Sequence, residues 1–258
     1  MGKVVAITNQ KGGVGKTTTS INLAASQART RRRVLLVDID PQGNATMGSG
    51  INKEAHPITT YEVLLGIEPI ESAMVSAEGG YDLIPANSRL SGAEVELIEL
   101  ERRERRLRGA LDNMRAQYDY ILVDCPPALN LLTVNALVAA QSVMIPMQCE
   151  YYALEGLTAL LNTVRKIRET WNPQLEIEGL LRTMYDPRNN LDNEVSAQLK
   201  QHFGDKLYRT VIPRNIRLAE APSHGKPVIA YDMQSKGAQA YLALAGEMLR
   251  REEEVVAA

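Results

Sequence analysis

The chain has 258 residues, of which 45% are hydrophobic and 23% charged, the proportions of an ordinary soluble globular protein. Its net charge of −2 excludes a protein that coats nucleic acid with its whole surface, so any DNA binding must come from a local basic patch. Two cysteines, Cys125 and Cys149, are too few for a disulfide framework or a CxxC-type metal site, and we expect two buried thiols. With no signal peptide and no apolar run of about 18 residues, we expect a cytoplasmic protein that does not enter a membrane.

The first predicted elements form a strand, a glycine-rich turn, a helix and a second strand. The run KVVAIT at 3–8 is typical of a buried strand, and a helix whose apolar residues fall mainly on one side begins at Lys16. The second buried strand covers 34–38. Because this order is that of a βαβ unit, we expect a parallel sheet.

The rest of the chain continues the alternation. Strands are predicted at 81–86, 118–127, 142–148 and 175–186, and helices at 91–116, 129–140, 153–169, 192–203 and about 236–253. This pattern predicts an α/β fold with a single doubly wound, mostly parallel sheet flanked by helices. No repeat or long linker divides the chain, so we expect one domain over 1–258, with an acidic tail that frays from about residue 252.

The turn after the first strand, NQKGGVGKTTTS at 9–20, contains a phosphate-binding motif. The general pattern is G-x-x-x-x-G-K-[ST], and this chain departs from it because its first glycine is replaced by Gln10. The glycines still allow a tight turn whose N–H groups, with the N-terminus of the next helix, form an anion cradle. We expect Lys16 to neutralise the β- and γ-phosphates of a nucleotide and Thr17 to bind Mg²⁺. The predicted nucleotide ligands in this motif are Gly12, Gly13, Val14, Gly15, Lys16, Thr17 and Thr18.

Carboxylates end two of the predicted strands. Asp124 closes YILVD, the position of a Walker B carboxylate, and we expect it to hold Mg²⁺ through water, since Mg²⁺ keeps much of its hydration shell. Asp38 and Asp40 flank Ile39 after the second strand, where alternation could turn both carboxylates the same way. The alternative for an Asp-x-Asp sequence after a strand is that it caps a turn.

Three segments, KGGVGKTT at 11–18, DIDPQGNAT at 38–46 and ILVDCPP at 121–127, together resemble the deviant Walker ATPases. Two more, QCEYYALEGL at 148–157 and VIPRNIRLAEAPSHGKPV at 211–228, are similar to the chromosomal ParA/Soj proteins within that superfamily. The resemblance extends from residue 3 to about 250. It implies a P-loop NTPase fold and an ATPase with ATP and Mg²⁺ as cofactors.

The resemblance also implies roles at the phosphates. Lys11 matches the signature lysine, which reaches across the two-fold interface of a homodimer to the ATP of the partner chain. Gly12 would let the two loops approach closely. Asp40 would orient the attacking water and Asp38 would support the metal shell, so the predicted catalytic residues are Lys11, Lys16 and Asp40, and the predicted metal site contains Thr17, Asp38 and Asp124.

Other contacts implied by the resemblance lie in the C-terminal half. Pro213, Arg214 and Asn215 are the predicted adenine-side residues, although PRN alone could be a plain turn. Arg188 and Arg217 match the position of a patch that faces sequence-independent double-stranded DNA, with ordinary surface arginines as the alternative. Such a protein would be cytoplasmic and nucleoid-associated. Its partner would be a centromere-binding protein of the ParB/Spo0J type, which accelerates an otherwise slow hydrolysis.

Two further basic runs are present. RRERRLR at 102–108 alternates with glutamate and is typical of a solvated, salt-bridged face. RTRRR at 29–33 could be the same, or could belong with EYYALEGL to a surface for the partner protein.

Four related classes of protein are alternatives. A MinD-like membrane regulator would need a basic amphipathic C-terminus, whereas this chain ends in LRREEEVVAA. A metabolic synthetase of the same fold would need a second substrate pocket, which no residues specify. A nitrogenase-type iron protein would need cysteines placed to hold a cluster, and a tyrosine-kinase relative would need a terminal tyrosine cluster; the chain shows neither.

Overall fold

The computed structural model describes residues 2–151 and 153–257 and builds them around one eight-stranded sheet. The strands lie in the order β3-β4-β2-β5-β1-β6-β7-β8, and every neighbouring pair is parallel except β3 with β4. This confirms the predicted doubly wound, mostly parallel sheet. The strands are β1 Lys3–Ile7, β2 Val34–Asp38, β3 Val75–Ser76, β4 Asp82–Ile84, β5 Tyr120–Asp124, β6 Ser142–Gln148, β7 Glu176–Tyr185 and β8 Leu207–Pro213.

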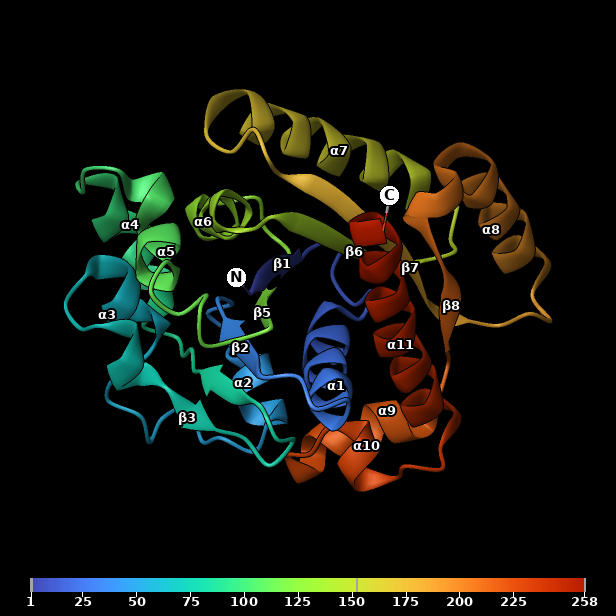
Figure 1. The fold of residues 1–258 in the computed structure, drawn as a ribbon, viewed down its shortest axis with the longest axis horizontal. Coiled ribbons are helices and arrows are strands. Elements are labelled where there is room, and N and C mark those ends of the chain that lie inside the picture. Colours follow the sequence, from blue (N-terminus) through green and yellow to red (C-terminus); the bar gives the residue numbers. More distant parts are fainter. Residues whose placement is uncertain (1, 152, 258) are drawn as a thin grey trace.

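Helices cover both faces of the sheet (Figure 1). One core cluster joins the sheet to α3, α4, α5, α6, α7 and α8, and the other joins it to α1, α2, α9, α10 and α11. The helices are α1 Lys16–Arg29, α2 Asn44–Gly48, α3 Thr60–Leu65, α4 Leu90–Ile98, α5 Arg106–Leu111, α6 Leu131–Ala139, α7 Ala153–Thr170, α8 Asn190–Phe203, α9 Ile216–Glu220, α10 Val228–Tyr231 and α11 Lys236–Ala257. None of those described is long and apolar enough to cross a membrane.

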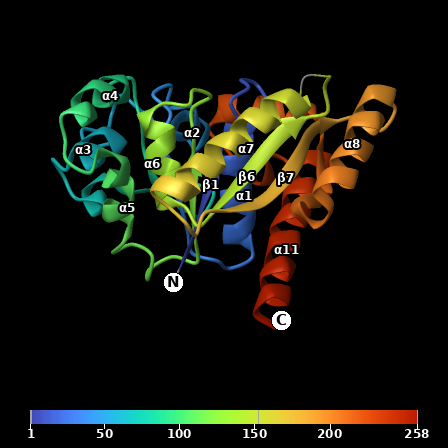
Figure 2. The ribbon, with the colours of Figure 1, turned by 90° about the horizontal axis from the view of Figure 1, so that it is seen from above.

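The central strands are buried on both sides, which is why the sequence shows continuous apolar runs there and not alternation. In β1, Val4 and Ala6 belong to one core cluster while Val5 and Ile7 belong to the other. All parallel strands end at one edge of the sheet, so the loop after β1 lies beside the ends of β2 and β5. Both chain ends lie on the opposite side (Figure 2).

Several predicted boundaries differ from the structure. The helix predicted at 91–116 is interrupted, because Arg102 takes a left-handed conformation (φ 54°) before a 3₁₀ turn at Arg103–Arg105. No Gly or Pro lies at this break, so the sequence carried no signal for it. Strand β8 was missed, since its edge position leaves a charged Arg209 on an exposed side. Helix α11 continues to Ala257, beyond the predicted end at about 253.

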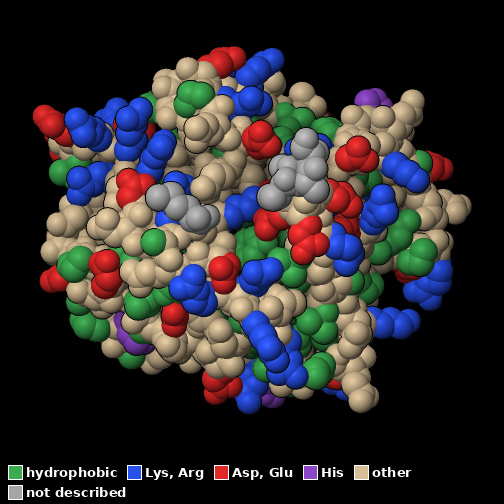
Figure 3. Space-filling model, viewed as in Figure 1, with side chains coloured by type: hydrophobic (Ala, Val, Ile, Leu, Met, Phe, Trp, Pro, Cys, Tyr) green, Lys and Arg blue, Asp and Glu red, His purple; other side chains and the backbone are tan. Residues whose placement is uncertain are grey.

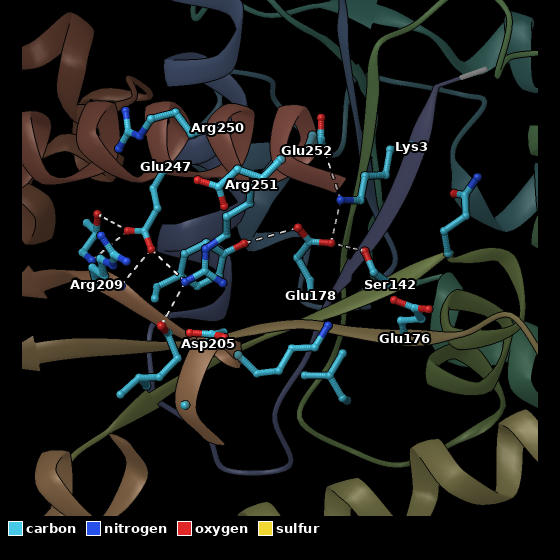
Figure 4. Close-up of a pocket in the computed structure, with 18 of the residues that line it drawn as sticks. Lys3, Ser142, Glu176, Glu178, Asp205, Arg209, Glu247, Arg250, Arg251 and Glu252 are labelled. Atoms are coloured by element: carbon cyan, nitrogen blue, oxygen red, sulfur yellow. Dashed lines mark hydrogen bonds and ion pairs between the residues drawn. The ribbon is translucent and has the colours of Figure 1, made fainter. Parts of the chain in front are cut away.

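Glu247 fastens α11 to the edge strand β8. Its carboxylate accepts hydrogen bonds from the backbone N–H groups of Arg209 and Thr210, each at 2.8 Å, and from the Thr210 hydroxyl at 2.7 Å. Arg251, one turn along α11, donates to Glu247 at 2.8 Å and lies over the Tyr208 ring (Figure 4). Because an edge strand leaves N–H groups unpaired, this carboxylate satisfies donors that would otherwise invite another chain.

Several of the charges around this clamp are paired within the chain. A cleft of about 1400 Å³ lies at the beginning of β6, β7 and β8, where Lys3 bridges Glu178 and Glu252 at 2.8 and 2.9 Å. Figure 4 shows these side chains in the cleft. Ser142 donates to the same Glu178 carboxylate at 2.6 Å. The ion pairs that line the cleft therefore hold α11 to the sheet.

Glu247→Gln should lower the free energy of unfolding by about 2–4 kcal/mol at neutral pH, because it leaves N–H donors without a full set of acceptors. Burial alone would raise the pKa of Glu247, but the bonds from Thr210, Arg209 and Arg251 outweigh it, and the pKa lies below its usual 4.5. The stabilisation is therefore present above pH 4.5 and lost as the pH falls through the lowered value.

Denaturant unfolding at several pH values measures this difference. Glu253→Gln, an exposed residue of the same helix, is the matched control and should change little. Equal losses in the two variants, or a difference that grows toward acid pH, would contradict the clamp.

Candidate functional site

The loop between β1 and α1 forms a cradle at the carboxyl edge of the sheet. Gly13 and Gly15 have φ angles of 73° and 87°, which glycine adopts at little cost and other residues avoid. Gly15 is also the N-cap of α1, so the first N–H groups of that helix point toward the loop. From β7, the Thr183 hydroxyl donates to the Val14 carbonyl at 2.7 Å and fixes the loop against the sheet.

Lys16 lies inside this cradle. Its Nζ donates to the Lys11 carbonyl at 3.1 Å, and the residue is only 7% exposed. Burial lowers the pKa of Lys16, while the neighbouring Asp124 and Asp40 oppose the shift. A buried ammonium whose bond to a backbone carbonyl is easily exchanged is suited to take the phosphates of a nucleotide.

Thr17, Ser20 and Asp124 form a compact polar group below the cradle. Asp124 accepts from the Thr17 hydroxyl at 2.8 Å and from the Ser20 hydroxyl at 2.7 Å, and it has no exposed surface. The register of the sheet pairs Asp124 with Ile7 on one side and with Asp38 on the other. Burial raises the pKa of Asp124, although the two hydroxyls oppose the change.

Asp38 is equally buried and is bound to the loop that follows it. Its carboxylate accepts from the Thr46 N–H at 2.8 Å, the Thr46 hydroxyl at 2.7 Å and the Asp40 N–H at 3.1 Å. Burial, followed by repulsion from Asp124, raises its pKa. Because its bonds shape the 40–46 loop, Asp38 fits a supporting role beside the metal site better than direct coordination.

The donor set suits Mg²⁺. Thr17 and Asp124 offer hard oxygens, and two adjacent buried carboxylates favour a nearby divalent cation. Among the described residues no group of three or more His, Cys, Asp or Glu side chains could hold a metal alone. Such a site fits an ion that keeps several waters and takes oxygens from a bound phosphate.

Asp40 lies close by, and its two carboxylate oxygens fit the two roles that the sequence left open, turn capping and the orientation of a water. Its Oδ1 accepts from the Gln42 N–H at 2.9 Å, which is the turn-capping arrangement. Its Oδ2 makes no hydrogen bond to the described part of the chain, and the residue is 7% exposed. One oxygen therefore orients the loop while the other remains able to accept from a water.

Lys11 points away from the cradle of its own chain. Its side chain is 47% exposed and forms an ion pair with Glu150, which follows β6. A Cβ built on the neighbouring Gly12 would meet no described atom within 4 Å, so nothing in the described parts of this chain requires glycine there. Both features leave this end of the loop accessible to a second molecule.

The predicted adenine-side residues follow β8 at the same edge of the sheet. Pro213 is the last residue of β8, and Asn215 caps α9 by accepting from the Arg217 N–H at 3.1 Å. Arg214 is exposed, and its charge acts on Asp186 in the loop after β7. The structure brings these residues to the edge of the sheet that carries the phosphate loop.

Comparisons with known proteins show the family of this chain. The family model described as an AAA domain matches residues 2–177. The sporulation initiation inhibitor protein Soj of Bacillus subtilis is 56% identical over 96% of this chain and 98% of its own, and the chromosome partitioning protein ParA of Caulobacter vibrioides is 53% identical over 98% and 96%. The chain belongs to the ParA/Soj family.

A solved structure supports the same fold for this ParA/Soj family member. The cobyrinic acid a,c-diamide synthase of Mycobacterium smegmatis, solved with bound ADP and magnesium, aligns with a TM-score of 0.86 at 37% identity. The alignment covers 98% of this chain and 96% of that one.

The two arginines predicted to contact DNA are paired within the chain. Arg188 donates to both oxygens of Asp186 at 2.9 and 2.7 Å, and Arg217 pairs with Glu220 at 2.8 Å and Asp232 at 3.4 Å. Both follow strands that end at the carboxyl edge of the sheet. A phosphate would have to replace these carboxylates, which are exposed enough for the exchange to be inexpensive.

Four residues that the sequence did not predict also shape the site. Ser20 lies three residues after Thr17 on α1 and so shares its face, a spacing that could have been used. Thr46 ends the DIDPQGNAT segment. Its bond to Asp38 could not be predicted, because it depends on the conformation of the loop between them. Thr183 in β7 and Glu150 after β6 are distant in sequence from the loop, and no sequence spacing indicated their contacts.

Thr17→Val should reduce the Mg²⁺-dependent gain in ATP affinity by about 10–100-fold, because it removes a metal-ligand hydroxyl while keeping the side-chain shape. Nucleotide titrations with Mg²⁺ and with EDTA measure the gain. Ser20→Ala removes the other hydroxyl from Asp124 without removing a metal ligand, so it should keep the Mg²⁺ dependence. A Thr17→Val protein that responds to Mg²⁺ like the wild type would exclude Thr17 from the metal site.

Proposed function

We propose that this protein is an ATPase that segregates DNA, on a chromosome or a plasmid. ATP with Mg²⁺ joins two chains in a sandwich dimer that binds double-stranded DNA without sequence preference, and hydrolysis releases it. The observation that carries the proposal is the buried group of Lys16, Thr17 and Asp124 beneath a glycine cradle. Identities of 53–56% to proteins named for chromosome partitioning or sporulation control support the cellular role. The continuous sheet supports treating 1–258 as one ATPase domain.

Catalysis is assigned to Lys16, Lys11 and Asp40. Lys16 neutralises the phosphates of the ATP bound to its own chain, and Lys11 supplies a second ammonium to the ATP of the partner chain, which stabilises charge on the transferred group. Asp40 orients the attacking water through its unoccupied Oδ2. Mg²⁺, when bound with ATP by Thr17 and Asp124, supplies charge neutralisation at the phosphates.

Slow basal hydrolysis follows from this set. We assign no glutamine or arginine within the chain to in-line activation, and a cation supplied by a partner raises such rates by about 10³ to 10⁵. We propose that this partner is a centromere-binding protein of the ParB/Spo0J type, and that the ATPase is cytoplasmic and associated with the nucleoid.

The DNA surface is proposed to include Arg188 and Arg217. Two phosphate contacts in each protomer become about four in a dimer, with an expected salt slope near −3.6, at about −0.9 for each contact. Two contacts alone hold DNA weakly, so dimer formation switches binding on. Their shared position at the carboxyl edge with the nucleotide loop supports this coupling.

Retention on random-sequence DNA at rising salt tests the proposal. Wild type should be retained with ATP and not with ADP at physiological salt. Asp40→Ala should stay bound, because ATP is not hydrolysed, and Lys11→Ala should not bind, because its loop cannot complete the partner site. Wild type that shows no dependence on ATP would remove the DNA function and leave only the ATPase fold.

A MinD-like membrane regulator is the first alternative, and the acidic C-terminus argues against it. A truncation at the C-terminus tests the membrane alternative, and the packing of α11 decides where the chain can be cut. Removing 248–258 would cut into the fold, because Met248 is fully buried and Arg251 bonds the Leu207 carbonyl at 2.9 Å. A chain ending at Glu254 avoids this. It should keep ATP-dependent DNA binding, and loss of binding to anionic vesicles on truncation would support the membrane alternative.

A metabolic synthetase is the second alternative, favoured by the likeness to the Mycobacterium smegmatis synthase. Such an enzyme needs an acceptor substrate beside the γ-phosphate. The large cleft lies at the beginning of β6 to β8, the edge opposite Lys16. ATP hydrolysis that is unaffected by DNA and partner but stimulated by a carboxylic acid substrate would support this alternative.

A further inference from the structure

The turn between α1 and β2 gathers arginines at the edge of the sheet opposite the nucleotide loop. Arg29, Arg31, Arg32 and Arg33 lie within five residues, and all four are exposed. Helix α1 has 14 residues, so at about 1.5 Å for each residue this turn lies about 20 Å from the loop. Figure 3 views the molecule from this side and shows Lys and Arg side chains over the end of α1.

A neighbouring cavity extends the basic surface. Arg32, Arg33 and Arg115 line a cavity of about 270 Å³ together with Asp119 and Glu252. Both carboxylates already have partners, because Asp119 accepts from the Arg33 N–H at 2.7 Å and Glu252 pairs with Lys3 at 2.9 Å. Three arginines therefore share this cavity with two carboxylates that are already engaged.

Three of the four exposed arginines of the turn are uncompensated, whereas Arg33 pairs with Asp119 at 3.8 Å. In residues 2–151 and 153–257, the side chains of Arg29, Arg31 and Arg32 form no ion pair or hydrogen bond. By contrast, Arg188 and Arg217 at the other edge are each held by carboxylates. These three unpaired arginines of the turn thus lie at the edge that the nucleotide site does not use.

Arg31 has a left-handed backbone conformation, in which glycine is the usual residue. The Arg31 N–H bonds the Ala28 carbonyl and the Arg32 N–H bonds the Gln27 carbonyl, which closes α1 in a Schellman arrangement with Arg31 at the left-handed position. Arg31 has a φ of 64°, which is unfavourable for any residue with a side chain. An arginine at this position adds a positive charge to the surface but makes the end of α1 less stable than a glycine would.

The surface chemistry favours a phosphate backbone over a protein partner. Protein interfaces depend on buried aromatic or aliphatic anchors, and none of the large hydrophobic side chains described as exposed lies in the 29–33 turn or lines the cavity. Arginine forks match phosphate oxygens, and backbone contacts need no apolar anchor.

We propose that the 29–33 turn and Arg115 form a second binding surface for the phosphate backbone of double-stranded DNA, which needs no nucleotide and no dimer. This surface goes beyond the proposed function, in which DNA binding depends on ATP. With Arg188 and Arg217 at the opposite edge, one molecule can contact two separate DNA segments. A weak, ATP-independent attachment of each chain to DNA follows.

The test is the salt dependence of binding to a random-sequence duplex with ADP at low ionic strength. The variant Arg31→Gly/Arg32→Ala removes two charges, and its glycine suits the left-handed backbone, so the fold is kept. The slope of log K against log salt should become shallower by about 1.8, at about 0.9 for each lost contact.

Arg102→Gly/Arg105→Ala is the matched control. It removes the same charge, and Arg102 is also left-handed, with a φ of 54°, but neither residue lines the cavity. The control should keep the wild-type slope. Equal slopes in wild type and Arg31→Gly/Arg32→Ala, or an equal change in the control, would overturn the proposal. So would an unchanged DNA slope combined with lost retention on polyglutamate, which would assign the surface to an acidic polypeptide.

The same titrations with ATP separate this inference from the proposed function. Arg31→Gly/Arg32→Ala should keep the wild-type ratio of ATP-state to ADP-state affinity. A wild type without ATP dependence would defeat the proposed function, while the difference in ADP-state slopes would still decide for or against the second surface.

Discussion

Asp38 and Asp124 are paired across neighbouring strands with no exposed surface, and the arrangement of the site follows from this burial. Buried carboxylates are costly unless charge and hydrogen bonds compensate them. Here Thr17 and Ser20 bond one and Thr46 bonds the other, while the ammonium of Lys16 lies near both Asp124 and Asp40. A divalent cation completes the compensation. The loop, the helix that begins at Lys16 and the strand order are all needed to bring these groups together.

The parallel sheet divides the molecule into two edges with different chemistry. At the carboxyl edge lie the nucleotide loop, the turn after Asp38 and the residues after β7 and β8. A nucleotide bound by the loop therefore lies at the same edge as these segments. The amino edge carries the α11 clamp at Glu247 and the arginine turn after α1. The contacts at the amino edge need no nucleotide. The proposed ATP-independent and ATP-dependent DNA contacts can therefore occur on the same chain.

Much of the fold and of the phosphate site could be predicted because local patterns determine them. Buried strands gave continuous apolar runs, and the loop needed glycines at left-handed positions such as Gly15. Contacts between distant strands could not be predicted. The bonds of Thr183 to Val14 and of Lys11 to Glu150 depend on how β6 pairs with β1 and how β7 pairs with β6. The break at Arg102 and the edge strand β8 were missed because tertiary packing overrides weak local preference there.

The account depends on Lys11 acting on the nucleotide of a second chain, since its own chain holds it outward on Glu150. The most direct test is to measure ATP affinity and sedimentation of Lys11→Ala in the same buffer with Mg²⁺. The account predicts near wild-type ATP affinity in the isolated chain together with a protein that sediments as a monomer, while wild type sediments as a dimer. A Lys11→Ala protein that still forms the ATP-dependent dimer would contradict it.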